Sequence, residues 1–325
     1  MDHLSQVIQQ VCDQTIWSRW QPLEGCWRGN GFPASGGIYC IREEGEDDLI
    51  YLGETGNIKQ RLAMLKPIYG EEMPYRSPHV AGPHLWALRQ AYSPGFEVSI
   101  APFDFDVPIR KGVEYLAIAL HRQRFKRSPR ANFGRMVAGW RASSSNTAQL
   151  VARGLRYRGG PTSLADESHL PSLAPLGPLE PGGSPHSLQW GRYSWSPWCH
   201  ITVADPGKVQ GIYRLRRDEY ELLFIGQGQI ADRLTGYKKL DVECSWVSGA
   251  WFYHQQLEII CDLVATYLLT CAALPPAQFG MSVHDCTLRQ SHSSSPDRAW
   301  WLMLLDMILQ EQPTPLVQEF MLAAG

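Results

Sequence analysis

Two tyrosines, an arginine and a glutamate stand in the first half of the chain as Tyr39, Tyr51, Arg61 and Glu114. These residue types suit hydrolysis of a phosphate ester, which needs a base for water, a cation for the developing charge and a Lewis acid at the phosphate oxygens. Positive charge beside a phenol favours its ionised form, so a tyrosine could accept the proton. The planar guanidinium of Arg61 suits paired hydrogen bonds to phosphate. The alternative is structural, because inward tyrosines in β-prone segments are ordinary core residues.

Glu114 lies in a helical segment where Ile118 and Phe125 mark a largely apolar stripe. A buried carboxylate without a partner is expensive, so a metal ion or an arginine is expected beside it. One glutamate with water and phosphate oxygens suits Mg²⁺, with Mn²⁺ as the alternative. Glu258 has a similar setting in the second half, where Asp262 is interpreted as a solvated or capping acid.

An internal repeat relates the two halves of the chain. The blocks WSRWQPL, GIYCI, IYLGETGNIKQRL, VEYLAIALHRQ and RANFGR are followed, in the same order, by WSPWCHI, GIYRLR, LFIGQGQIADRL, LEIICDLVATYLL and PAQFGM. Tyr39 precedes Arg61 by 22 residues, and Tyr213 precedes Arg233 by 20. Five matched blocks in one order indicate two copies of one domain, the second partly diverged. The shared tryptophans predict a brace over each sheet, with a base-stacking surface as the alternative.

The elements that must position these residues are short strands and helices. GGIYCIRE and DLIYLGE flank an acidic turn and predict a hairpin, NIKQRLAML and KGVEYLAIALHRQRF predict helices, and FEVSIAPF predicts a third strand in the first copy. The fold class is therefore α+β, with a domain at residues 1–158 and a second at 188–325. Residues 159–187, dense in Pro, Gly and Ser, predict a linker.

These motifs resemble the GIY-YIG nuclease superfamily, and the resemblance covers both halves. It implies two tandem domains, each a small three-stranded antiparallel sheet flanked by helices, that hydrolyse DNA with a metal ion. Carried over, the first copy offers the catalytic residues Tyr39, Tyr51, Arg61, Glu114 and Asn132, with Glu114 as the metal ligand. Asn132 is equally well interpreted as a turn residue before a glycine.

The second copy departs from the pattern. Carried over, it offers the catalytic residues Tyr213, Arg233 and Glu258, with Glu258 as the metal ligand, but Phe224 and Gln278 replace the second tyrosine and the asparagine. Many members also carry a histidine four residues after the arginine. Leu65 and Tyr237 occupy those positions, so that role is empty or filled by another residue. The candidates are Lys66, His79, His84 and Lys238.

Charge is distributed unevenly along the chain. Residues 1–160 hold 20 basic and 15 acidic residues, whereas residues 161–325 hold 10 and 17. The stretch from Arg110 to Arg158 has twelve basic residues and one acid, which predicts a DNA-binding track, with a solvated face as the alternative. The predicted DNA contacts are Arg110, Lys111, Arg122, Arg124, Lys126, Arg127, Arg130 and Arg135.

Other classes of protein are disfavoured. The N-terminal residues lack the pattern of a secretory signal, and the apolar run from Leu263 to Leu274 is too short to cross a membrane, so a cytoplasmic protein without membrane contact is expected. Eight cysteines without a CxxC pair argue against structural zinc and a disulfide framework.

The function that the resemblance implies is a metal-dependent DNA endonuclease, of the kind used in restriction, phage defence or mobile elements. Two alternatives are open: a non-cleaving nucleic-acid-binding or scaffold protein with the same fold, and a repair nuclease acting on branched or damaged DNA. The missing tyrosine and the acidity of the second half predict a degenerate second copy. The two copies would act as an intramolecular pseudo-dimer, or the chain would form a homodimer.

Overall fold

The structure is a computed structural model of the 325-residue chain. It describes residues 17–28, 31–74, 79–103, 105–142, 149, 152–154, 159–162, 167–176, 183–271 and 273–288. The chain forms two compact units. The first-copy unit comprises residues 17–106 and 124–174, and the second-copy unit comprises residues 107–123 and those from 175 on.

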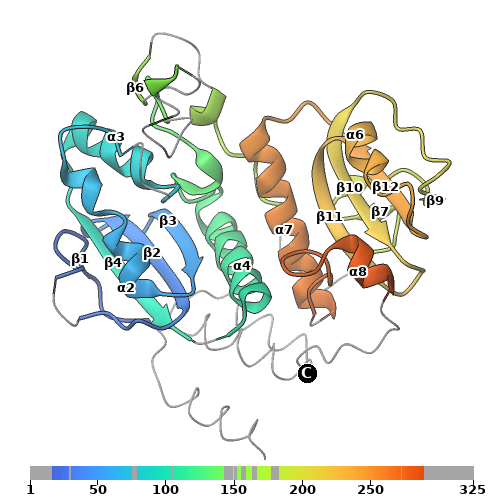
Figure 1. The fold of residues 1–325 in the computed structure, drawn as a ribbon, viewed down its shortest axis with the longest axis horizontal. Coiled ribbons are helices and arrows are strands. Elements are labelled where there is room, and N and C mark those ends of the chain that lie inside the picture. The colour runs from blue at the N-terminus through green and yellow to red at the C-terminus, as the bar shows by residue number, and fades with distance from the viewer. Residues whose placement is uncertain are drawn as a thin grey trace, which may run out of the picture. The chain divides into compact units, whose positions relative to one another are not determined.

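The first-copy unit is built around an antiparallel sheet in the strand order β1-β4-β2-β3 (Figure 1). Its strands are β1 (Gln21–Pro22), β2 (Gly37–Glu43), β3 (Leu49–Thr55) and β4 (Phe96–Pro102). Helices α2 (Ile58–Ala63) and α3 (Gly82–Tyr92) and the 3-10 turn η1 (Lys66–Tyr69) lie between β3 and β4. The unit ends with η2 (Asn132–Gly134), the two-residue strands β5 (Trp140–Arg141) and β6 (Gly160–Pro161), which pair, and η3 (Glu167–His169).

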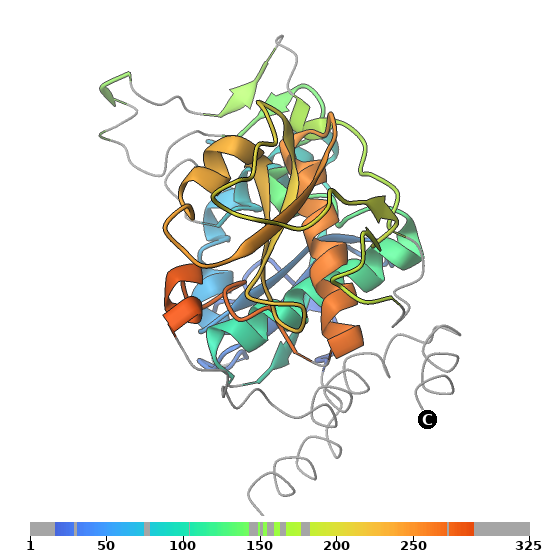
Figure 2. The same cartoon turned by 90° about the vertical axis from the view of Figure 1, so that its right-hand side faces the viewer.

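The second-copy sheet has the same order, β9-β12-β10-β11. Its strands are β9 (Cys199–His200), β10 (Gln210–Arg216), β11 (Leu222–Gln229) and β12 (Glu243–Ser248), preceded by the paired strands β7 (Gln189–Trp190) and β8 (Tyr193–Ser194). Helices α6 (Ile230–Thr235) and α7 (Tyr253–Cys271) pack against this sheet (Figure 2). Helices α4 (Val107–Phe125) and α8 (Val283–Leu288) complete the described elements.

The α+β class and the predicted hairpin, third strand and helices of the first copy are confirmed. One detail differs. Each sheet has a fourth, two-residue strand at its edge. The third strand that the resemblance implies for the second copy is β12, whose position no local pattern marks. The two hairpins also share an irregularity in their strand pairing. In each, the register shifts just before an arginine, between Ile41 and Arg42 and between Leu215 and Arg216.

The repeated Trp-Ser-x-Trp motif is a brace that ties the chain to the third strand. Ser18 donates its N–H to the carbonyl of Ile100 at 2.7 Å, and its hydroxyl accepts the N–H of Ile100 at 3.1 Å. Ser196 makes the same two bonds to Trp246, at 2.8 and 3.1 Å. The motif therefore extends each sheet at its edge, which explains the additional strands.

The second tryptophan of each motif stacks on an arginine. In the first copy the Arg42 guanidinium lies 4.0 Å from the Trp20 ring centre and pairs with Glu97 of β4. Such a stacked cation contributes about 0.5–1 kcal/mol or more when desolvated. The matching set in the second copy is Trp198, Arg216 and Glu243. These contacts support the brace interpretation of the tryptophans rather than a base-stacking surface.

Helix α4 groups with the second copy as far as Gln123, although the predicted boundary placed it within residues 1–158. The reason is visible in its contacts, because Cys261 of α7 donates its thiol to the carbonyl of Tyr115 at 3.1 Å and Arg122 pairs with acids of α7. The predicted linker also takes part in folding. Its Ser172 hydroxyl accepts the N–H of Ser128 in the first-copy unit.

Candidate functional site

The two tyrosines of the first copy face one another on adjacent strands. Tyr39 of β2 and Tyr51 of β3 are buried, with ring centres 5.8 Å apart. Gly53 is the register partner of Tyr39, and a Cβ at Gly53 would lie 2.6 Å from the Tyr51 ring. The glycine of the YLG motif is therefore required because any side chain there would displace the second tyrosine.

His79 completes this aromatic cluster from the segment that precedes α3. Its Nε2 lies 2.7 Å from the hydroxyl oxygen of Tyr39, and its ring centre lies 5.2 Å from that of Tyr51. Burial lowers the pKa of His79 to about 3, helped by the positive charge of Arg61, so the imidazole is neutral near pH 7. Its Nδ1 accepts the N–H of Ala81 at 3.2 Å, which assigns the single ring proton to Nε2.

This tautomer makes His79 a donor to the oxygen of Tyr39. A hydrogen bond donated to a phenol oxygen stabilises the negatively charged phenolate over the neutral phenol. Arg61, half-buried on α2, places positive charge close to the same cluster. Tyr39, Tyr51, Arg61 and His79 therefore form one site, assembled from four separate segments. Of the four residues considered for the histidine role, His79 is in contact with Tyr39, whereas His84 bonds to the carbonyl of Arg135.

The second copy repeats the position of the cluster with different chemistry. Tyr213 is buried beside Phe224 and Tyr237, with ring centres 6.1 and 6.3 Å away. Burial raises the pKa of Tyr213 well above its usual range, and its hydrogen bond with Tyr237 raises it further, against an opposing effect of Arg233. The second copy therefore keeps Tyr213 as a neutral phenol, bonded to another phenol in place of an imidazole.

Asn132 clamps the edge strand of the first copy. Its Oδ1 accepts the N–H of Leu52 at 2.9 Å, and its Nδ2 donates to the carbonyl of Leu52 at 2.7 Å. Gln278 makes the same pair of bonds to Ile225, at 3.0 and 3.1 Å. Each side-chain amide therefore makes the pair of hydrogen bonds that a neighbouring strand would make to β3 or β11. This gives Asn132 a structural role. It also explains why glutamine can stand at the matching position of the second copy.

The clamps predict matched losses of stability. Asn132→Ala and Gln278→Ala should each lower the free energy of unfolding by about 1–3 kcal/mol, because each leaves a buried peptide group without its partner. Gln60→Ala, at an exposed position of α2, should stay within about 0.5 kcal/mol of the unmodified protein. Urea unfolding measures the free energy of unfolding of all three variants. If Asn132→Ala and Gln278→Ala lose no more stability than Gln60→Ala, the clamp is contradicted.

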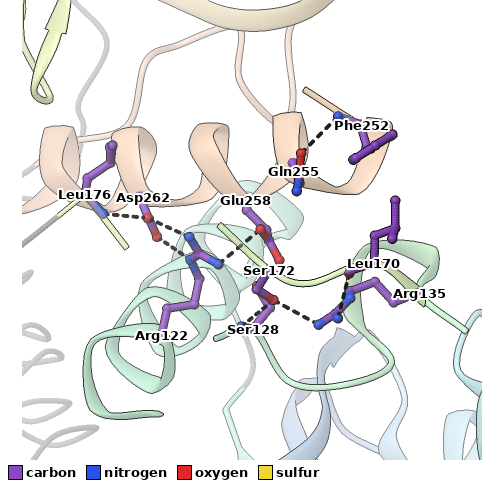
Figure 3. Close-up of polar contacts among 10 residues, drawn as sticks. All are labelled: Arg122, Ser128, Arg135, Leu170, Ser172, Leu176, Phe252, Gln255, Glu258 and Asp262. Carbon is purple, nitrogen blue, oxygen red and sulfur yellow. Dashed lines mark hydrogen bonds and ion pairs between the residues drawn. The ribbon is translucent and has the colours of Figure 1, made fainter. Parts of the chain in front are cut away.

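Glu258 and Asp262 hold Arg122 in a fully buried ion cluster between α7 and α4 (Figure 3). Arg122 donates from Nε and Nη2 to the two carboxylate oxygens of Asp262 at 2.8 and 3.1 Å, and its Nη1 lies 3.4 Å from Glu258. Burial disfavours the charged guanidinium, but Asp262 and Glu258 together raise the pKa of Arg122 above its ordinary value. Leu176 donates its N–H to Asp262 at 3.1 Å.

The cluster corrects three expectations. The partner of Glu258 is an arginine, so this carboxylate does not fit a metal ion, whose charge would repel the guanidinium. Arg122 is fully buried and has no surface to offer DNA. Asp262 is neither solvated nor a cap, because both of its oxygens are bonded inside the second-copy unit.

Glu114 is half-buried on α4 and its charge acts on Tyr115 and Cys261 of the same unit. One half-buried carboxylate is a suitable donor for Mg²⁺, which completes its shell with water and phosphate oxygens. Among the described residues no group of three or more histidine, cysteine or acidic side chains gathers as a metal site. A site with a single carboxylate would not form such a group, so Glu114 stays a predicted ligand.

Three arginines at the end of α4 and directly after it pair with acids of the β2–β3 hairpin. The three ion pairs join Arg124 to Asp47 at 3.1 Å, Arg127 to Asp48, and Arg130 to Glu43 at 2.6 Å. The acids of this hairpin therefore balance positive charge in the basic segment. Counting charged residues within residues 110–158 alone does not include them. Each of these arginines therefore already has a carboxylate partner within the first-copy unit.

The other predicted DNA contacts are placed as follows. Arg110 is buried, and Lys111 lies 5.9 Å from the ring centre of Phe279. Arg135 donates to the hydroxyl of Ser172 at 2.9 Å and to a carbonyl of the linker (Figure 3). Lys126 is exposed. The structure thus does not present residues 110–135 as a continuous row of exposed cations.

No family model matches this chain, and no curated protein or solved structure matches it either. Within the part of the chain that the structure describes, no helix has the length and apolarity needed to cross a membrane.

Proposed function

We propose that the protein is a metal-dependent DNA endonuclease in which the first copy carries the catalytic centre. The observation that carries this proposal is the hydrogen bond of 2.7 Å between Tyr39 and a neutral His79, beside Tyr51 and Arg61. A buried phenol that receives a hydrogen bond and lies near a guanidinium is equipped to take a proton from water. Defence against foreign DNA or a mobile-element role would suit this activity.

In this proposal Tyr39 is the base and His79 positions it and stabilises its anionic form. Arg61 binds a phosphate oxygen and balances the charge that develops there. The metal ligand of this proposal is Glu114, as the resemblance implies, and a bound Mg²⁺ would supply Lewis-acid stabilisation of phosphate oxygens. The second copy offers neither a base nor a metal ligand, because Tyr213 is held neutral and Glu258 is bound to Arg122.

A non-cleaving nucleic-acid-binding or scaffold role is the second candidate, and it is favoured by the second copy, where Phe224 replaces the second tyrosine. The two candidates differ in what they predict for a supercoiled plasmid. A nuclease with one competent centre converts the plasmid first to the nicked circle, whereas a binding protein leaves it supercoiled.

The deciding experiment incubates the protein with unmodified, methylated and branched DNA in the presence of Mg²⁺, with EDTA as the control. We expect nicking that EDTA abolishes, and Glu114→Gln should raise the Mg²⁺ concentration for half-maximal activity by about tenfold or more. Glu71→Gln is the matched control, since it removes one exposed carboxylate of the first copy. If all three kinds of DNA stay uncut although the protein still binds them, the second candidate is favoured.

A further inference from the structure

Two cysteines of the second copy face each other across neighbouring strands. Cys199 of β9 and Cys244 of β12 are register partners in the antiparallel pair, and their sulfur atoms are 4.0 Å apart. Both are free thiols in the structure. Directly opposed residues of antiparallel strands have Cα atoms about 4.5–5.5 Å apart. That separation lies within the range of roughly 4.4–6.8 Å that a disulfide requires.

The pair belongs to the second copy alone. The short edge strand of the first copy follows its brace in the same way, and there the register partners are Gln21 and Val98. The brace, the stacked arginine and the edge strand are all kept between the copies, whereas the residues at this register position differ in chemistry. The cysteines are therefore not needed to build the strand pair.

The surroundings give the two thiols different access to a reagent. Cys199 is partly exposed at the sheet edge, whereas Cys244 is fully buried in the core that also contains Tyr213. Burial and the neighbouring Cys199 thiol raise the pKa of Cys244 to about 12. A reagent from solvent would thus meet Cys199 first, and Cys244 would act second.

We propose that Cys199 and Cys244 are a site of reversible disulfide formation by a low-molecular-weight disulfide such as oxidised glutathione. Cys199 releases its proton to water and its thiolate attacks one sulfur of the reagent, breaking the reagent's S–S bond and expelling one glutathione thiolate. Cys244 then loses its proton and attacks the sulfur of Cys199, and the second glutathione thiolate leaves. Two protein thiols are oxidised and one glutathione disulfide is reduced to two thiols.

The bond would pin β9 to the third strand of the second copy. It would close a loop that contains β10, β11 and α6, and so would restrain the unfolded chain. We therefore expect the oxidised protein to melt at a higher temperature than the reduced one.

The test treats the full chain with oxidised glutathione, blocks remaining thiols with an alkylating reagent and maps the peptides by mass spectrometry. We expect a cross-linked pair of peptides containing Cys199 and Cys244, about 2 Da lighter than the two free peptides together, that dithiothreitol separates. Cys199→Ser should abolish it. Cys271→Ser, at an exposed cysteine elsewhere in the same unit, should leave it unchanged.

Two results would overturn the proposal. One is a protein that carries glutathione on Cys199 and never forms the cross-link, which would mean that Cys244 cannot approach. The other is a cross-link that forms equally fast in urea, since the reaction would then owe nothing to the strand pair. Because the readout is a peptide mass in the unmodified protein, it does not depend on any variant folding or on nuclease activity.

Discussion

Replacing Tyr39 with phenylalanine should lower the rate of DNA cleavage by about 10²- to 10⁴-fold, the usual contribution of a general base. The phenyl ring keeps the packing against Tyr51, whose ring centre is 5.8 Å away, but it removes the oxygen that lies 2.7 Å from His79. Proton transfer from water then has no acceptor at this position. The measurement is the initial rate of nicking of supercoiled plasmid at saturating Mg²⁺.

Tyr213→Phe is the matched control, because it makes the same change at the same place in the second copy. We expect it to leave the cleavage rate within about twofold, since Tyr213 is a neutral phenol bonded to Tyr237. Equal loss in both variants would mean that the two copies share the chemistry. Full activity in Tyr39→Phe, with a melting temperature near that of the unmodified protein, would remove Tyr39 from the reaction.

The low pKa of His79 predicts how the stability of the protein depends on pH. Because burial lowers its pKa to about 3, His79 is neutral when folded at pH values where a free histidine, near pH 6.5, begins to gain a proton. The contribution of this neutral form to stability is therefore present above about pH 6.5 and is lost as the pH falls towards 3. Cleavage profiles should accordingly show no step near pH 6.5 from His79.

Replacing Arg122 with alanine should lower the free energy of unfolding of the second-copy unit by about 3–5 kcal/mol. The change leaves the carboxylates of Glu258 and Asp262 buried and without the cation that compensates them. Urea unfolding, followed by tryptophan fluorescence, measures the loss. The buried position makes this effect much larger than that of any exposed ion pair in the molecule.

Arg127→Ala is the control, since Arg127 is exposed in its ion pair with Asp48. It should cost no more than about 1 kcal/mol. A second comparison combines Arg122→Met, Glu258→Leu and Asp262→Leu, which removes all three charges together and should destabilise the unit less than Arg122→Ala alone. If Arg122→Ala lowers the free energy of unfolding by no more than Arg127→Ala does, the buried cluster is not formed.

The sequence by itself determined the elements that depend on near neighbours. The hairpin follows from two β-prone segments around an acidic turn, and the helices follow from apolar spacing, so local patterns were enough to predict them. The internal repeat predicted that Tyr39 and Tyr213 hold the same place in two sheets, and the shared register confirms it. The two-residue edge strands escape prediction because they are short and depend on the Trp-Ser brace for their pairing. A third strand in the second copy is implied by the resemblance, but no local pattern places it at β12.

Only the tertiary structure decided which charged and polar groups meet. His79 lies 40 residues from Tyr39, in a segment with no pattern that marks it as a partner. Arg122 finds Asp262 at a separation of 140 residues, and Arg124 finds Asp47 at 77. Charge counted along a chain says nothing about neighbours in space. For that reason the sequence predicts a DNA track in the basic segment and a metal ligand at Glu258, whereas folding supplies each with an opposite charge.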